Sequence, residues 1–570
     1  MCHRITSIAK PADKARPPKG GIPALFCLVW AGAAQAALPP NILLLVAEDL
    51  SPRIGSFGDP VARTPNIDAL AQSGIRFTNV FTTAGVCAPS RAALITGLHQ
   101  ISFGAQHMRS HDSVLGEYFP QPAEEVKAFP ELLRKTGYYT YTDTKLDYQF
   151  SGVPAGSGPF TIWDAEGEST HWRNRPDGQP FFGLINFIQT HESGVMRTTG
   201  NPHSESHRST RQWRRLRGLI APAVTDPNSV LLPSYYPDVA EVRADLTRHY
   251  DNIHAMDQQV GRILNELKQD GLMDNTVVIW TTDHGDGLPR AKRELYDSGL
   301  KVPMVVLLPA SVQASFSGRF STPGTINQKL ISFVDLAPTL LSLAGAPAQQ
   351  YHHGINFLTQ SRRYVYASRD RIDEVPDRQR AVRNHRYKYI HSWHPQTPGG
   401  HELVYRDNLD MVRTMRAMYE NGELDAIQSR WFEAPGREQL YDLLHDPEEV
   451  VNLAGSPDHA VTKSELSAEL HAWLARVGDM SNVPEKEMRN AFLIEGEIPT
   501  TPAPTARQIN GSIDLRASMN ASIGYRVDGG IWQLYTGPIT RPAGTLLESK
   551  AVRYGYRESA ILSLSLVSDD

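Results

Sequence analysis

Apolar residues in the first part of the chain fall into two patterns that alternate along the sequence. Short uninterrupted apolar runs are typical of parallel strands that are buried on both faces. Between them, apolar residues recur three or four positions apart, as on one face of a helix. The predicted strands are 41–47, 138–142, 181–188, 276–280 and 302–308, and the predicted helices are 64–70, 129–135, 241–270 and 335–343. This alternation predicts an α/β fold with a mixed, mostly parallel sheet sandwiched by helices.

Polar and ionisable residues directly follow four of these predicted strands. In strand order they are Glu48 with Asp49, Lys145, His191, and Asp283 with His284. Ligands of open α/β sheets bind outside the carboxyl ends of the strands. We therefore expect these side chains to meet in one site at that edge of the sheet.

The pattern changes after about residue 376. Residues 381–390 alternate in the manner of a strand, and a helix is predicted at 463–477. These features predict a small α+β subdomain over 376–480. A linker is expected over 481–507, which is rich in proline and threonine towards its end. Short strands and glycine turns over 508–570 predict a small terminal module resembling a β-sandwich.

The N-terminus has the features of a signal peptide. Basic residues up to Lys19 precede an apolar run at 22–33, and Ala34-Gln35-Ala36 forms a small-x-small cleavage site. The run is too short for a spanning helix, and no later stretch reaches that length. We expect a signal peptide over 1–36, a catalytic domain over 37–375, and export to the periplasm or beyond a bacterial cell.

Composition and cysteine content narrow the function. Hydrophobic residues make up 41% of the chain, charged residues 21%, and the net charge is −5, so nothing favours nucleic acid as a partner. No oligomeric state is indicated either. Cys2 and Cys27 lie in the predicted signal peptide, which leaves Cys87 without a disulfide partner. A single thiol kept in an oxidising compartment favours a chemical role.

The segment around Cys87 combines a nucleophile with an environment for an anion. Pro89 suits the first turn of a helix, and residues 92–95 continue in helix-permissive residues. Cys87 therefore lies at or just before a helix N-terminus, where unpaired amides and the helix dipole favour negative charge. Arg91 adds a positive charge one turn later.

This segment, Cys-Ala-Pro-Ser-Arg at 87–91 followed by Thr96-Gly97, resembles the signature of the type I, formylglycine-dependent sulfatases. The resemblance covers about 38–478 and is closest to bacterial sulfatases of the heparan N-sulfatase (sulfamidase) type. Its further matches are 232–233, 243–246, 256–258, 274–277 and 440–442. The resemblance implies an alkaline-phosphatase-like fold and hydrolysis of sulfate esters, or of N-sulfate groups, in a sulfated oligosaccharide or polysaccharide.

The resemblance also implies two cofactors. In this family the cysteine is oxidised to Cα-formylglycine, an aldehyde whose hydrate attacks the sulfate, so Cys87 would need a formylglycine-generating enzyme or an anaerobic maturase as partner. The second cofactor is a divalent cation, Ca²⁺ or alternatively Mg²⁺, which prefers oxygen ligands. The implied metal ligands are Glu48, Asp49, Cys87, Asp283 and His284.

The implied catalytic residues are Cys87, Arg91, Lys145, His191 and Lys292. By resemblance, Arg91 stabilises the hydrated aldehyde and helps to hold the metal cluster. Lys145 and Lys292 hold sulfate oxygens, and His191 protonates the leaving group. Each of these lysines would otherwise be interpreted as a solvated surface residue, and their order along the chain favours the functional interpretation.

Two positions depart from the family pattern. Glu48 replaces the usual aspartate, which keeps the charge but changes its reach. Asp147 replaces a common histidine, and a carboxylate cannot bind an anion as an imidazolium does, so the role of Asp147 stays open.

A cluster of arginines is either a rim for an anionic glycan or a solvated basic face. Its members are Arg208, Arg211, Arg214, Arg215 and Arg217.

Three classes of function fit this sequence. The favoured one is a sulfatase that acts on sulfated glycans. The second is a phosphate or phosphonate monoester hydrolase of the same superfamily, although phosphatases use serine or threonine as nucleophile where this chain has Cys87. The third is a noncatalytic glycan-binding protein, which the retention of Cys87, Arg91 and both lysines disfavours.

Overall fold

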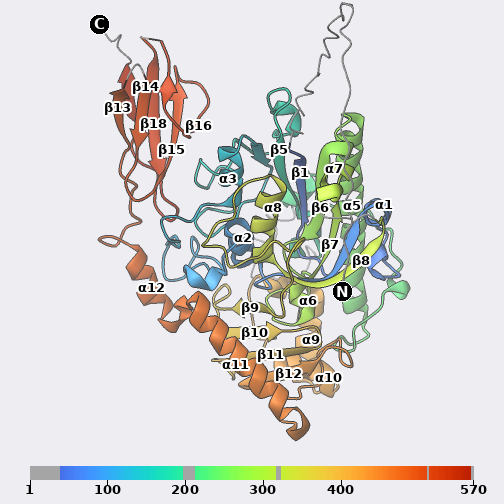
Figure 1. The fold of residues 1–570 in the computed structure, drawn as a ribbon. Coiled ribbons are helices and arrows are strands. Elements are labelled where there is room, and N and C mark those ends of the chain that lie inside the picture. The colour runs from blue at the N-terminus through green and yellow to red at the C-terminus, as the bar shows by residue number, and fades with distance from the viewer. Residues whose placement is uncertain (1–38, 197–211, 316–321, 510–511, 543, 566–570) are drawn as a thin grey trace, which may run out of the picture. The chain divides into compact units, whose positions relative to one another are not determined.

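The computed structural model describes residues 39–196, 212–315, 322–509, 512–542 and 544–565 (Figure 1). The predicted signal peptide lies outside these residues. No helix in the described part of the chain is both long and apolar enough to cross a membrane.

An eight-stranded sheet forms the centre of the main domain. Its strands are β1 (Asn41–Ala47), β2 (Ile75–Phe81), β3 (Tyr139–Thr142), β4 (Ala165–Glu166), β5 (Phe181–Phe187), β6 (Thr276–Thr282), β7 (Lys301–Leu307) and β8 (Thr325–Ser332). The order across the sheet is β4-β3-β5-β1-β6-β7-β2-β8. Only β7 runs antiparallel to its neighbours. The predicted mixed, mostly parallel sheet is confirmed.

The central strand β1 explains the two-sided core. All seven of its residues are buried, and they alternate between the faces of the sheet. Leu44 and its alternate neighbours join one apolar core, to which helices α2 (Cys87–Thr96), α3 (Phe129–Lys135) and α8 (Leu336–Leu343) contribute. Leu43 and its alternate neighbours join a second core with α1 (Pro65–Ser73) and α5 (Ala240–Gln269) (Figure 1). The predicted sandwich of helices around the sheet is therefore confirmed.

The helices of this domain lie close to the predicted ranges. They are α1 (Pro65–Ser73), α2 (Cys87–Thr96), α3 (Phe129–Lys135), α5 (Ala240–Gln269), α6 (Asp297–Leu300), α7 (Ala310–Ser315) and α8 (Leu336–Leu343). Gly97 ends α2 in the left-handed region, with φ 70°, where glycine carries no Cβ penalty.

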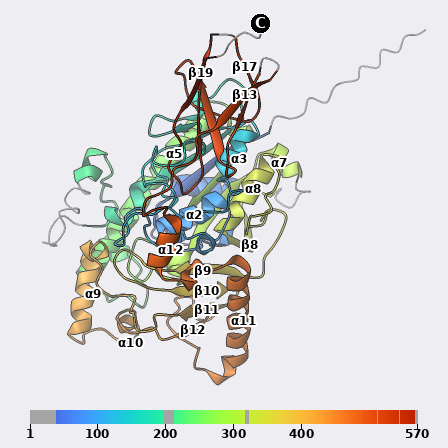
Figure 2. The same ribbon diagram turned by 90° about the vertical axis from the view of Figure 1, so that its left-hand side faces the viewer.

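A four-stranded antiparallel sheet follows, in the order β12-β11-β10-β9. Its elements are β9 (Val365–Arg369), β10 (Gln379–Arg383), β11 (Tyr387–Ser392), β12 (Glu438–Asp442), α9 (Asp410–Glu420), α10 (Ala426–Ser429) and α11 (Ala460–Val477). Helix α11 packs Leu466, Leu470 and Trp473 against this sheet (Figure 2). Strand β9 begins ahead of residue 376, where we expected the subdomain to start.

Two further sheets pack face to face near the C-terminus. They consist of β13 (Thr505–Ile509), β14 (Ser512–Arg516) and β17 (Ile539–Thr540), and of β15 (Ser522–Val527), β16 (Gln533–Leu534), β18 (Leu546–Val552) and β19 (Leu562–Ser565). Ile513 and Leu547 share one apolar core between them. The stretch expected as a linker contains helix α12 (Glu485–Phe492) and the start of β13.

Candidate active site

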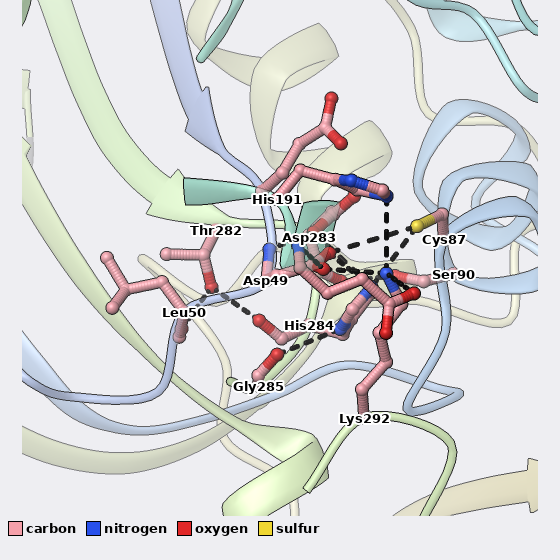
Figure 3. Close-up of polar contacts among 12 residues, drawn as sticks. Asp49, Leu50, Cys87, Ser90, His191, Thr282, Asp283, His284, Gly285 and Lys292 are labelled. Carbon is pink, nitrogen blue, oxygen red and sulfur yellow. Dashed lines mark hydrogen bonds and ion pairs between the residues drawn. The ribbon is translucent and has the colours of Figure 1, made fainter. Parts of the chain in front are cut away.

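The four strands that precede the predicted site residues are neighbours in the sheet. Strands β3, β5, β1 and β6 are adjacent and parallel, so their carboxyl ends meet at one edge. The side chains that follow them meet there, together with Cys87 from α2 and Lys292 from the loop after β6 (Figure 3). The expected convergence is therefore observed.

Cys87 is the first residue of helix α2, as its sequence predicted. The Ser90 hydroxyl donates a hydrogen bond of 2.6 Å to the carbonyl oxygen of Asp283, which ties the first turn of α2 to the end of β6. The thiol is fully buried. Its sulfur lies 3.3 Å from His284 Nε2 and 4.0 Å from Asp49 Oδ1. Cys87 is thus held inside the cluster of acidic residues.

Asp49, Cys87, Asp283 and His284 form a group whose possible ligand atoms all lie within 4.8 Å of one another. Glu48, Asp49 and His191 form a second group by the same measure. His284 Nε2 is 3.2 Å from Asp49 Oδ1, and its Nδ1 is 2.9 Å from the carbonyl oxygen of Gly285. The ring is therefore oriented with Nε2 towards the carboxylates.

Asp49 is held in an uncommon backbone conformation. Its φ of 51° lies in the left-handed region, which aspartate tolerates better than most residues. Its backbone N–H donates to Asp283 Oδ1 at 3.1 Å, and the N–H of Glu192 donates to Asp49 Oδ2 at 2.7 Å. A Cβ at Gly287 would lie 2.9 Å from Asp49 Oδ2, so only glycine leaves that oxygen undisturbed. These contacts fix the direction of the carboxylate.

Three buried cations surround the acidic cluster. Arg91 Nε lies 3.1 Å from Asp283 Oδ2. The ammonium group of Lys145 is 2.9 Å from Glu48 Oε2. The ammonium group of Lys292 is 2.6 Å from an Asp49 oxygen and 3.4 Å from Nε2 of His191, which is only half-buried. The arrangement therefore places positive charge around Cys87 and leaves His191 nearest the solvent.

The electrostatics of the cluster favour an ionised thiolate on Cys87 next to a protonated imidazolium on His284. Burial opposes ionisation of Cys87, but the charges of Lys145 and Lys292 lower its pKa to about 5. Burial would also lower the pKa of His284, yet the negative charges at Asp283, Cys87 and Asp49 raise it to about 10. An environment that holds a proton on His284 so firmly is also one that attracts a metal cation.

The donor set suits a divalent cation. Three carboxylates supply the hard oxygen atoms that Ca²⁺ and Mg²⁺ prefer, and His284 adds one nitrogen. Glu48 Oε1 is buried without a hydrogen-bond partner among the described residues. The Arg91 guanidinium lies 3.9 Å from this oxygen, too far for a hydrogen bond. A buried carboxylate oxygen without a hydrogen bond is costly, and a cation would satisfy it. The residues present therefore fit the implied metal.

The structure shows what surrounds Asp147, whose role the sequence left open. Asp147 is fully buried and accepts two hydrogen bonds from Arg109, at 2.7 and 2.9 Å. Burial would raise its pKa, but the Arg109 guanidinium holds that pKa below the usual range. The ammonium group of Lys145 lies 3.9 Å from Asp147 Oδ2. Asp147 thus positions a guanidinium beside the site.

Sequence reasoning missed Arg109 and two other residues of this site. Asn186 accepts a hydrogen bond of 2.7 Å from Arg91 and is the second-last residue of β5, so its place near the strand end could have indicated it. Glu192 pairs with Lys292 at 3.1 Å and follows His191 directly. Arg109 lies in an irregular segment and carries no such signal.

The arginine cluster divides into different environments. Arg208 and Arg211 lie outside the described residues. Arg214 is fully buried and donates to backbone carbonyl oxygens, so it is neither a rim group nor a solvated one. Arg217 lines a cavity beside Lys145.

The sheet topology and the site at its edge place the chain in the alkaline-phosphatase-like fold class, as predicted. A family model described as Sulfatase matches residues 40–174 and 165–346. An ulvan-active sulfatase of Formosa agariphila is 37% identical over 567 residues, covering 94% of this chain and 93% of that protein.

Two further comparisons agree. Human N-sulphoglucosamine sulphohydrolase is 25% identical over 491 residues, covering 79% of this chain and 93% of that protein. The solved structure of a 2-O GAG sulfatase shares the fold with a TM-score of 0.54 at 20% identity, covering 78% of this chain and 94% of that one. The chain belongs to the sulfatase family and is a sulfuric ester hydrolase, which confirms the predicted family.

Proposed function

We propose that this sulfatase removes sulfate from a sulfated glycan, with Cys87 as the precursor of its nucleophile. The observation that carries the proposal is the position of Cys87, at the start of α2 and 3.3 Å from His284 within the acidic cluster. The name of the ulvan-active relative, which is similar along almost the whole chain, supports a sulfated polysaccharide as substrate. The human relative, named for N-sulphoglucosamine, supports a sulfated amino sugar as the alternative.

Each cofactor would supply one kind of chemistry. A cation held by Glu48, Asp49, Asp283 and His284 would withdraw charge from the sulfate as a Lewis acid. A formylglycine hydrate made from Cys87 would supply the attacking oxygen. Both assignments rest on the family resemblance and on the fit of these residues. Maturation of Cys87 and export from a bacterial cell are parts of the same proposal.

The residues of the chain divide the remaining work. Lys145 and Lys292 hold the sulfate oxygens, since both ammonium groups are buried and their charges act on Cys87. Arg91 orients Asp283 through its 3.1 Å contact. His191 Nε2 lies 3.4 Å from the Lys292 ammonium group, and His191 is half-buried. It can therefore donate a proton to the leaving oxygen on the solvent-facing side of the site.

A screen of substrates tests this proposal. We expect the matured protein to release inorganic sulfate from at least one of four sets of defined oligosaccharides, derived from ulvan, heparin, chondroitin and carrageenan. The ulvan set is the first candidate because of the relative named above. The alternative function, a phosphate or phosphonate monoester hydrolase, would give release from those esters and no sulfate from any glycan. A noncatalytic glycan-binding protein would release neither.

Removal of divalent metal should abolish turnover, and Ca²⁺ or Mg²⁺ should restore it, because three carboxylates are gathered around the nucleophile. Calorimetric titration of metal-free protein should show one binding site, and Asp283→Asn should weaken it at least tenfold. Circular dichroism separates metal loss from unfolding. Full activity of protein verified to be free of metal would refute the assignment.

We expect the Arg109 guanidinium, which Asp147 holds beside the site, to donate one hydrogen bond to the sulfated substrate. Arg109→Ala should then raise KM for that substrate about tenfold, because one charge-assisted hydrogen bond is worth roughly 1.5–3 kcal/mol. Steady-state kinetics measure this effect, and Arg109→Lys should recover part of it. Arg173→Ala is the matched control, since Arg173 forms an ion pair with Asp270 while its side chain is 50% exposed. An unchanged KM in Arg109→Ala would show that Arg109 does not contact substrate.

A further inference from the structure

A cavity of about 660 Å³ opens at the carboxyl-end edge of the sheet, beside the candidate active site. Lys145 and Ile188, which follow strands β3 and β5, form part of its wall. Trp213, Arg217 and Leu219 line it from another segment of the chain. Its size falls in the range of small-molecule sites, roughly 300–1,000 Å³. Because Lys145 belongs to both, the cavity borders the site described above.

The wall that carries Trp213 is fixed by a buried arginine. Arg214, the next residue, donates hydrogen bonds to the carbonyl oxygens of Ile188 at 3.1 Å, Gln189 at 2.8 Å and Leu219 at 3.2 Å. These contacts tie the wall to the end of β5, immediately before His191. The segment that carries Trp213 is therefore anchored, while Trp213 itself stays 40% exposed.

The cavity combines an aromatic surface with a charge pair. The Arg217 guanidinium lies 5.8 Å from the centre of the Trp213 ring. Arg217 also forms an ion pair with Glu168, which lines the cavity as well. An exposed indole offers a flat apolar face for the C–H face of a sugar ring, and a guanidinium suits a carboxylate or a sulfate group. An acidic sugar presents both features, a C–H face and an anionic group.

We propose that this cavity binds a sugar unit of the glycan next to the unit that carries the reacting sulfate. Trp213 stacks on that sugar, and Arg217 pairs with its acidic group. The inference rests on the proposed function, because it assumes that the substrate has at least two sugar units. It adds a binding site that determines which glycan is accepted, and it assigns Trp213 as the residue with the largest contribution.

Binding to protein that cannot turn over tests the cavity separately from catalysis. In the Cys87→Ala background, calorimetry should be run with an ulvan-derived tetrasaccharide, a heparin-derived tetrasaccharide and inorganic sulfate. Trp213→Ala should weaken binding of at least one tetrasaccharide tenfold or more, the usual scale for one buried aromatic contact. Trp213→Phe should lose less than threefold. Affinity for inorganic sulfate, which needs only the lysine site, should stay within twofold.

Leu216→Ala is the matched control, because Leu216 lies in the same segment, is 78% exposed and does not line the cavity. It should change none of these affinities. The proposal is overturned if neither tetrasaccharide binds, if Trp213→Ala binds both within twofold of its parent, or if sulfate and tetrasaccharide affinities fall together. If the wild-type protein releases no sulfate from any glycan but Trp213→Ala still loses affinity, the proposed function fails and the cavity assignment stands.

Discussion

Protein carrying Cys87→Ser should lose turnover and accumulate one covalently bound sulfate group. A serine hydroxyl in the position of Cys87 keeps the same placement beside His284 and the two lysines, so it can attack sulfur once. It has no second hydroxyl on the same carbon with which to expel the sulfate. We therefore expect a single event followed by a stall, with sulfate release lowered by at least a hundredfold.

Cys87→Ala is the matched variant for this experiment, because it removes the attacking group altogether. Intact-protein mass spectrometry after incubation with substrate should show the mass of one sulfuryl group (SO3) added to the serine variant and nothing added to the alanine variant. Peptide spectra of active wild-type protein should show an aldehyde in place of the Cys87 thiol. A serine variant that turns over at the wild-type rate, or an unmodified thiol in fully active protein, would refute this role of Cys87.

Replacing either lysine of the site should cause the second large loss. The side chains of Lys145 and Lys292 are 7% and 1% exposed, and their charges lower the pKa of Cys87. Charge placed so close to the reacting sulfate in a dry site stabilises the transition state, and losing one such donor costs about a hundredfold to a thousandfold in kcat. We expect that loss for Lys145→Ala and for Lys292→Ala.

The control for the two lysines is Lys135→Ala. Lys135 is the last residue of α3, away from the strand ends that form the site, and its side chain is 39% exposed. It should leave kcat unchanged. Lys145→Arg and Lys292→Arg keep the charge and should lose less than the alanine variants, which separates lost charge from lost folding. Thermal unfolding of each variant monitors that folding. A change below about threefold in kcat would show that the lysine had been wrongly assigned.

The sequence was most informative about features that a short run of neighbouring residues determines. The continuous apolar run at β1 predicts a buried parallel strand, and the structure buries every residue of it. The residues after β3, β5, β1 and β6 were expected to meet because parallel strands end at one edge. That Cys87 would begin a helix followed from Pro89 and the residues after it. Each of these inferences depended on local pattern alone.

Features that depend on distant segments could not be predicted in this way. The strand order, in which β5 and β6 flank β1, is set by packing of the whole domain. Arg109 meets Asp147, which lies 38 positions further along the chain, from a segment without regular structure, so no periodicity marks it. Arg214 belonged to a cluster expected to be either a rim for an anionic glycan or a solvated basic face. Its charge suggested a surface position in both cases, yet hydrogen bonds to the carbonyl oxygens of Ile188 and Gln189 offset the cost of its burial. Helix α12, which lies in the expected linker, has only eight residues and follows Pro484. The stretch was therefore interpreted as a loop.

The central claim is that this chain hydrolyses sulfate esters of a glycan. Its most direct test measures inorganic sulfate released from defined ulvan, heparin, chondroitin and carrageenan oligosaccharides by matured wild-type protein, with release from phosphate and phosphonate esters measured in parallel and Cys87→Ala as the blank. We predict release of sulfate from at least one glycan, at a rate above that for either phosphorus ester, and none from Cys87→Ala. Faster release from the phosphorus esters, or no sulfate from any glycan, would contradict the claim.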